Sequence, residues 1–255
     1  MIEQGLVFGA LALVAYFVRG ITGAASAIVF NAIFLVLVAL DLVAGLTVRD
    51  GIYWIALANA LASVFMGGAL ARSWRPERFV LLLMAGSLPM NVIFTLLLPE
   101  IDTGGLTAAM AAVIMLTGIF LATRGERAPL SERTLNRLAV PIGITAGILG
   151  GLFGMAGPAL FLLLSSAGSD PTLFRARVTL INSTSSILRL GVLATQGVYT
   201  ADRLGAFALS APAVLVGIAV GMYAHRFVRP GPFRIVLGAL VSLAGALALV
   251  QTIAG

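Results

Sequence analysis

The most restrictive feature of the sequence is a charge-free stretch of 32 residues between Arg137 and Asp170. One helix needs roughly 20 apolar residues to cross a bilayer, so two crossings need roughly 40, and the stretch fits neither. At its centre, residues 150–158 read GGLFGMAGP. Inside a helix, a glycine costs about 1 kcal/mol and a proline about 3 kcal/mol relative to alanine. We therefore expect a helix that enters the membrane, breaks at these glycines and restarts after Pro158, a residue that the first turn of a helix tolerates.

A break of this kind predicts a binding site. Unpaired backbone groups are costly in lipid, and they are tolerated only where protein or a water-filled cavity satisfies them. The restarted helix would direct free N–H groups and the positive end of its dipole into the gap, which favours an anion. Gly154, Met155, Ala156 and Gly157 are therefore candidates for contact with a substrate. The alternative is a glycine-rich seam that lets two helices pack closely.

The composition predicts the fold class, because 60% of the residues are hydrophobic and only 10% are charged. We expect an all-α polytopic membrane protein that lies in the lipid bilayer. The net charge of +6 comes from arginines scattered between apolar segments, which is a topology signal and not a nucleic-acid surface. The single histidine and the lack of a metal or acid–base motif argue against an enzyme, and no cofactor is expected. Further charge-free runs of spanning length cover residues 51–71, 79–99, 103–123, 204–224 and 235–255.

The chain also contains a weak internal repeat. Residues 20–30 match residues 151–161 at four of eleven positions, against about one expected from composition. We therefore predict a first repeat at 1–123, a cytoplasmic linker at 124–137 and a second repeat at 138–255. Each repeat would be a broken, re-entrant helix hairpin followed by three transmembrane helices.

Short cytoplasmic loops hold an excess of basic residues, so the positions of the arginines test this arrangement. If each broken segment returns to the side from which it came, one face holds only Arg49 and Arg203. The opposite, cytoplasmic face then holds Arg72, Arg75, Arg78, Arg124, Arg127, Arg133, Arg137, Arg175, Arg177, Arg226, Arg229 and Arg234. This arrangement, in which each broken segment returns to its own side, places both termini on the extracytoplasmic side of the cytoplasmic membrane. It also gives the halves opposite orientations, an inverted repeat like that of many secondary transporters.

Two arginines, Arg19 and Arg189, remain at membrane depth, where a charge usually marks function. Asn182, Ser186 and Arg189 share one helical face, with Ser183 beside them. Because the charge-free segments hold no carboxylate, and a guanidinium suits an oxyanion or a carboxylate, the missing counter-charge is predicted to be the substrate. The alternatives are that Arg189 reaches the lipid headgroups and that Arg19 caps helix carbonyls.

Polar and small residues near the first break complete the candidate site. Hydrogen bonds between helices would explain Asn31 and Asn59 equally well. The candidates are Gly23, Ala24, Ala25, Ser26, Asn31 and Asn59.

The glycine-rich breaks resemble those of the TauE/SafE family of membrane transporters. The likeness covers most of the chain and includes residues 147–158, PTLFRA at 171–176 and GVY at 197–199. The family's central break commonly reads as a run of glycines, and Ala156 replaces one of them here. The resemblance implies a secondary carrier of sulfur-containing anions, such as sulfite or organosulfonates.

For such a carrier we expect alternating access around a midplane site. Phe153, Met155 and Phe161 would offer an apolar lining for the carbon skeleton of an organosulfonate. Import or export, H⁺ or Na⁺ as the coupling ion, and monomer or homodimer are left open. The alternatives in function are an anion channel, or a carrier of a small carboxylate or inorganic anion.

Overall fold

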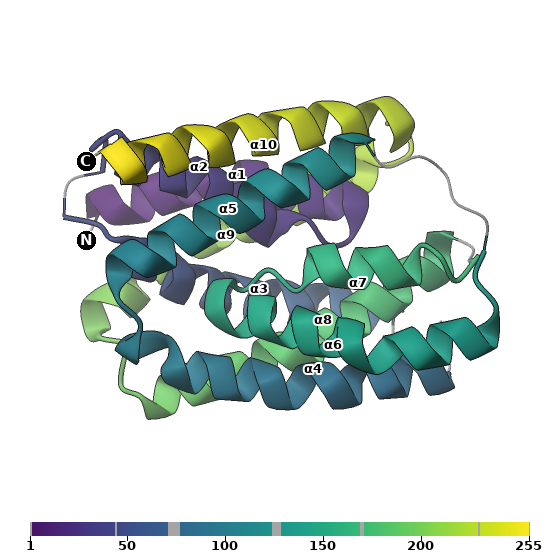
Figure 1. Cartoon of the computed structure of the whole chain (residues 1–255). Coiled ribbons are helices and arrows are strands. Elements are labelled where there is room, and N and C mark those ends of the chain that lie inside the picture. Colours follow the sequence, from purple (N-terminus) through teal and green to yellow (C-terminus); the bar gives the residue numbers. More distant parts are fainter. Residues whose placement is uncertain are drawn as a thin grey trace.

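The computed structural model describes residues 2–43, 45–70, 77–123, 129–168, 171–228 and 230–254. These residues form helices and short connections, with no strand among them (Figure 1). The helices are α1 Ile2–Thr22, α2 Ser26–Ala39, α3 Val48–Leu70, α4 Arg78–Leu97, α5 Thr103–Thr123, α6 Glu132–Phe153, α7 Gly157–Leu164, α8 Pro171–Thr195, α9 Ala201–Ala224 and α10 Pro230–Ala254. A 3₁₀ turn, Leu98–Glu100, extends α4.

Six of the described helices are long and apolar enough to cross a membrane. They are α1, α4, α5, α6, α9 and α10. The predicted all-α polytopic fold is therefore confirmed. The predicted span at residues 51–71 falls in α3, which is not one of the six. Instead, α3 packs against α8 between the α1–α9 and α4–α6 pairs.

Both predicted breaks are present. Three residues, Gly23–Ala25, separate α1 from α2, and another three, Gly154–Ala156, separate α6 from α7. Gly23 has a φ of 86° and Gly154 a φ of 70°, a left-handed conformation that glycine adopts without steric cost. The Gly154 N–H donates to the carbonyl of Gly150 and ends α6, and α7 begins with Pro158 in its first turn.

Glycines allow the long helices to pack in close pairs. A Cβ placed on Gly221 in α9 would lie 2.1 Å from the carbonyl oxygen of Phe17 in α1. A Cβ on Gly143 in α6 would lie 2.3 Å from the carbonyl oxygen of Leu83 in α4, and Gly118 in α5 meets the backbone of α10 equally closely. In these three seams, the glycines therefore allow two helices to pack closely. The seams bring the two broken segments into the same bundle.

The helix contacts are nearly unchanged when the two halves are exchanged, with α1–α5 standing for α6–α10. The exchange turns the α1–α9 pair into α6–α4 and the α3–α9 pair into α8–α4, and it maps α3–α8 and α5–α10 onto themselves. The short hairpin limbs depart from this pattern in part. The contacts of α2 with α1 and α3 correspond to those of α7 with α6 and α8, but α2 also packs against α5 and α10. The pattern supports the inverted repeat, which stays a prediction, as does the boundary at 124–137. Within that linker, residues 124–128 lie outside the described residues and α6 already begins at Glu132.

The first and last described residues lie at the same end of the bundle, here named the terminal end (Figure 1). The other end is named the opposite end. Which end faces the cytoplasm rests on the arginine distribution and stays a prediction. Of the twelve arginines assigned to the cytoplasmic face, those outside the described residues are Arg72, Arg75, Arg124, Arg127 and Arg229.

Candidate functional site

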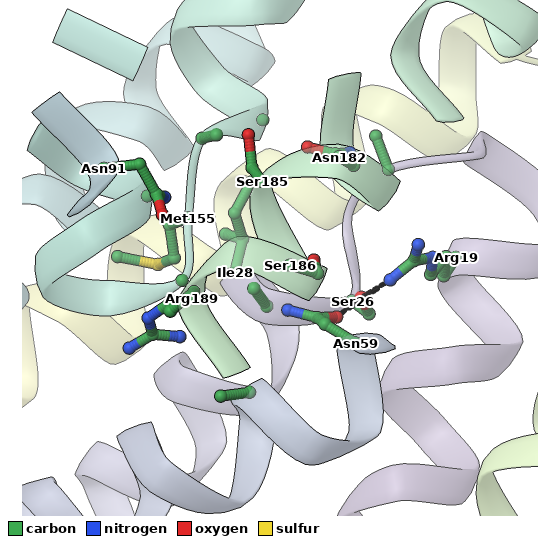
Figure 2. Close-up of a pocket in the computed structure, with 17 residues that line it drawn as sticks. Arg19, Ser26, Ile28, Asn59, Asn91, Met155, Asn182, Ser185, Ser186 and Arg189 are labelled. Carbon is green, nitrogen blue, oxygen red and sulfur yellow. Dashed lines mark hydrogen bonds between the residues drawn. The ribbon is translucent and has the colours of Figure 1, made fainter. Parts of the chain in front are cut away.

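The two breaks meet at a cavity of about 30 Å³, which is room for roughly two water molecules (Figure 2). The cavity is enclosed by the end of α1, the start of α2, the middle of α3 and parts of α4, α6, α7 and α8. Its lining consists of Arg19, Ala24, Ser26, Ala27, Ile28, Ala56, Asn59, Asn91, Gly150, Gly154, Met155, Ala156, Gly157, Asn182, Ser185, Ser186 and Arg189.

Among the described residues that line this cavity, Arg189 has the most nitrogen atoms without a hydrogen-bond partner. The residue is only 2% exposed, and its Nε, Nη1 and Nη2 atoms all lack a hydrogen-bond partner among the described residues. The ion pairs in the described part of the chain involve other arginines. This burial excludes the alternative in which Arg189 reaches the headgroups. Because a buried charge without a partner costs several kcal/mol, the site calls for an anion.

Arg19 is also buried, but neutral side chains satisfy part of it. Its Nη1 donates to Asn59 Oδ1 at 2.8 Å and to Ser26 Oγ at 3.4 Å. Tyr16 Oη donates to the same Asn59 oxygen at 2.9 Å. The Arg19 Nε and Nη2 atoms have no partner among the described residues. Arg19 is therefore held by side chains from α2 and α3, whereas the expected alternative was a cap on helix carbonyls.

The N-termini of two short helices open onto the same cavity. Ser26 begins α2 and Gly157 begins α7, and both residues line the cavity. Neither helix has a side-chain cap. The first N–H groups of a helix have no partner within it, and they carry the positive end of its dipole. The two breaks are adjacent, because a Cβ on Gly157 would lie 3.4 Å from the carbonyl oxygen of Ala24.

One face of α8 supplies polar groups between the arginines. Asn182, Ser186 and Arg189 line the cavity as their spacing predicts, together with Ser185. Arg189 and Arg19 lie on opposite sides of the cavity with Ser186 between them (Figure 2). The site thus combines two cations with amide and hydroxyl groups, and no carboxylate lines it.

Most of the predicted site residues come together here, although their contact with a substrate stays a prediction. The predicted residues that do not line the cavity are Gly23, Ala25, Asn31 and Ser183. Gly23 forms the first turn and packs against the side chain of Arg175. Asn31 Nδ2 donates at 2.8 Å to the carbonyl of Phe153, and this bond ties α2 to the end of α6. These two residues hold the breaks in place instead of facing the cavity.

Sequence reasoning left several lining residues out of the predicted contacts and misplaced two others. The lining residues outside the predicted contacts are Ala27, Ile28, Ala56, Asn91, Gly150 and Ser185. The signals were present for Asn91, a polar residue within an apolar span, and for Gly150, which opens the glycine run. Phe153 and Phe161 were expected in the apolar lining, but Phe153 packs in the core and Phe161 packs edge-on against the ring of Phe174. The apolar lining comes instead from Met155, Ile28 and the alanines.

Comparison with known proteins identifies a family for the chain. The model of the family described as "Sulfite exporter TauE/SafE" matches residues 8–248. A curated relative, the "Probable sulfite/organosulfonate exporter TauE" of Cupriavidus necator, is 27% identical over 212 residues, which cover 80% of this chain and 78% of the relative. No solved structure matches the chain significantly.

Proposed function

The chain belongs to the sulfite exporter TauE/SafE family, and on this basis we propose that it moves a small sulfur-containing anion, sulfite or an organosulfonate, through the cavity between its two breaks. The family consists of exporters, so the chain is a multi-pass membrane transporter and not an enzyme. The family match confirms the resemblance to the TauE/SafE family and the assignment to membrane transporters.

The unpartnered guanidinium of Arg189 carries the proposal. A sulfite or sulfonate group presents oxygens that can accept hydrogen bonds from the planar fork of an arginine. Such an anion would supply the charge and the acceptors that Arg189 lacks in the described residues. The free Nη2 of Arg19 and the starts of α2 and α7 add further donors on the other sides of the same cavity.

The rest of the lining suits a small substrate. Asn182, Ser185 and Ser186 can hydrogen-bond to oxygens that the arginines do not reach. Met155 and Ile28 offer apolar contact to a short carbon skeleton of an organosulfonate. All of these groups come from a single chain, so the proposal requires no homodimer.

The small size of the cavity supports alternating access. A volume of about 30 Å³ does not admit a hydrated anion, so loading and release require the helices to move. In inverted-repeat transporters one repeat rocks against the other around a central site. Each of the close pairs α1–α9, α4–α6 and α5–α10 joins helices from both halves, so we assign this motion to the bundles that these pairs form on either side of α3 and α8.

We propose export from the cytoplasm with the terminal end outside, the orientation favoured by the arginine distribution. A negative-inside potential drives an anion outward by about 2.3 kcal/mol per charge per 100 mV. Export can therefore run without a coupling ion, whereas import would need H⁺ or Na⁺.

Counterflow in proteoliposomes tests the proposal. Vesicles that contain the purified protein and unlabelled sulfite should accumulate labelled sulfite, and a short organosulfonate should compete. Arg189→Gln should abolish the accumulation, and the exposed Arg133→Gln should keep it. Equal transport of chloride or sulfate would contradict the substrate assignment, and ion currents without counterflow would indicate a channel.

A further inference from the structure

Two ion pairs occur among the described residues, and they lie at opposite ends of the bundle. Arg203 Nη2 donates to Asp50 Oδ1 at 2.7 Å, which joins the first turns of α9 and α3 at the terminal end. Arg177 Nε donates to Glu77 Oε2 at 2.6 Å, and Arg177 Nη2 contacts Oε1 of the same carboxylate. This second pair joins α8 to the residue that precedes α4. The lengths of α3 and α8 separate the two pairs.

The two pairs occupy equivalent places in the two halves. Arg177 follows Asp50 by 127 residues, and Arg203 follows Glu77 by 126 residues. Exchange of the halves therefore turns the α3–α9 bridge into the α8–α4 bridge, with the acidic and basic partners interchanged. The offset matches that of Gly118 and Gly245, which line the same α5–α10 seam.

Each pair also has an aromatic support. The Arg203 guanidinium lies 5.2 Å from the ring centroid of Tyr53, and the Arg177 guanidinium lies 5.2 Å from that of Phe79. In both cases the ring belongs to the helix that the carboxylate begins. The same set of an acid, a ring and an arginine from the neighbouring helix is thus present at each end.

The pair at the terminal end lines a second, larger cavity. Asp50, Tyr53 and Arg203 line this cavity of about 310 Å³, together with Tyr199. The Tyr199 hydroxyl donates to the Tyr53 carbonyl at 3.4 Å. Ala56, which follows Tyr53 in α3, lines the anion cavity, so α3 contributes to the lining of both cavities.

The pair at the opposite end lies next to the first break. Arg175, two residues before Arg177, donates from Nη2 to the carbonyl of Gly20 at 3.0 Å. The start of α8 is thereby tied both to Glu77 and to the last turn of α1, the turn that carries Arg19.

We propose that Asp50–Arg203 and Glu77–Arg177 are reciprocal latches that hold the two ends of the transport path closed. This inference rests on the proposed alternating access. Opening toward the terminal end breaks the first pair and keeps the second, and opening toward the opposite end does the reverse. The Asp50–Arg203 pair is partly exposed, with an Arg203 side chain that is 40% accessible, so it can be broken at low cost. The Arg177 side chain is only 5% accessible, so the pair with Glu77 is the costlier one to break.

The absence of cysteine from the sequence allows a direct test. Ala56 lines the anion cavity, and Ala56→Cys places a single thiol there. Its rate of modification by a membrane-impermeant thiol reagent is measured in right-side-out and inside-out vesicles. Asp50→Asn should raise labelling from the terminal end about two- to fivefold, the effect of losing a partly exposed ion pair. Glu77→Gln should raise labelling from the opposite end by at least the same factor, because it leaves the buried Arg177 without its carboxylate.

Three controls separate latching from loss of structure. Asp102→Asn removes the negative charge that precedes α5 at the terminal end but keeps an oxygen that can accept from the Gly105 N–H, and Glu132→Gln removes an exposed acid in the first turn of α6 at the opposite end. Neither should change the sidedness of labelling. The exchange Asp50→Arg with Arg203→Asp should restore the original rates.

Changes in the same direction for Asp50→Asn and Glu77→Gln, or no change in either, would overturn the latches. Labelling does not require a known substrate, and sulfite counterflow is measured separately, in variants that keep Ala56. If the substitutions do not change the side from which the thiol is labelled while sulfite counterflow is intact, only the latches are refuted. If labelling is side-specific but sulfite counterflow is absent, only the assigned substrate is refuted.

Discussion

Gly154 and Arg189 lie so close that a Cβ at position 154 would stand 2.6 Å from Arg189 Nη1. Gly154→Ala should therefore displace the guanidinium, and it should also strain the backbone at φ 70° by about 1–2 kcal/mol. We expect a lower melting temperature in detergent and loss of anion binding. Gly191→Ala is the matched control, because a Cβ there meets nothing within 4 Å and alanine favours a helix. Unchanged anion affinity in Gly154→Ala would contradict the close contact.

The lack of partners for Arg189 predicts a gain in stability when its charge is removed. Arg189→Gln should raise the free energy of unfolding of the anion-free protein by at least about 1 kcal/mol, because a buried unpaired charge destabilises the folded state. Arg177→Gln should have the opposite effect, since it breaks the pair with Glu77. Thermal unfolding in anion-free buffer compares the two variants. A lower melting temperature for Arg189→Gln would show that a partner already satisfies this side chain.

Asn59 is the acceptor that organises the Arg19 side of the cavity. Its Oδ1 accepts bonds from Arg19, Tyr16 and Ser26, so Asn59→Ala should cost about 2–4 kcal/mol of stability and weaken anion binding. Asn31→Ala loses one bond to the Phe153 carbonyl and should cost about 1–3 kcal/mol. It should leave the affinity of the folded protein nearly unchanged. Titration of both variants with anion, after unfolding measurements in denaturant, checks this contrast.

The seam between α1 and α9 should tolerate no side chain. Gly221→Ala places a Cβ 2.1 Å from the Phe17 carbonyl oxygen, and we expect a loss of about 1–3 kcal/mol or more from overpacking. Gly231→Ala, at the open start of α10, should be neutral or slightly stabilising. Melting temperatures of the two variants decide the matter, and equal values would argue against close packing in the seam.

The sequence predicted the features that depend on local chemistry. Glycines at 23 and 154 can adopt the left-handed conformation, and the spacing of Asn182, Ser186 and Arg189 places them on one helical face regardless of their neighbours. The breaks and this face were therefore predictable from residue type and periodicity.

Features that depend on packing between distant helices were not predictable in the same way. Asn91 reaches the cavity because the α4–α6 seam brings it beside Gly150. Phe161 turns away because Phe174 in α8 offers its ring an edge-on contact. The bonds of Arg19 to Asn59 and Ser26 likewise depend on how α1, α2 and α3 meet. A single sequence shows which residues share one face of a helix, but it does not show which other helix packs against that face.

Equilibrium binding of labelled sulfite to the purified protein tests the central claim most directly. The account predicts saturable binding to the wild type and to Arg133→Gln, which changes an exposed arginine, and loss of binding in Arg189→Gln with the protein still folded. Sulfite binding by Arg189→Gln with unchanged affinity would contradict it.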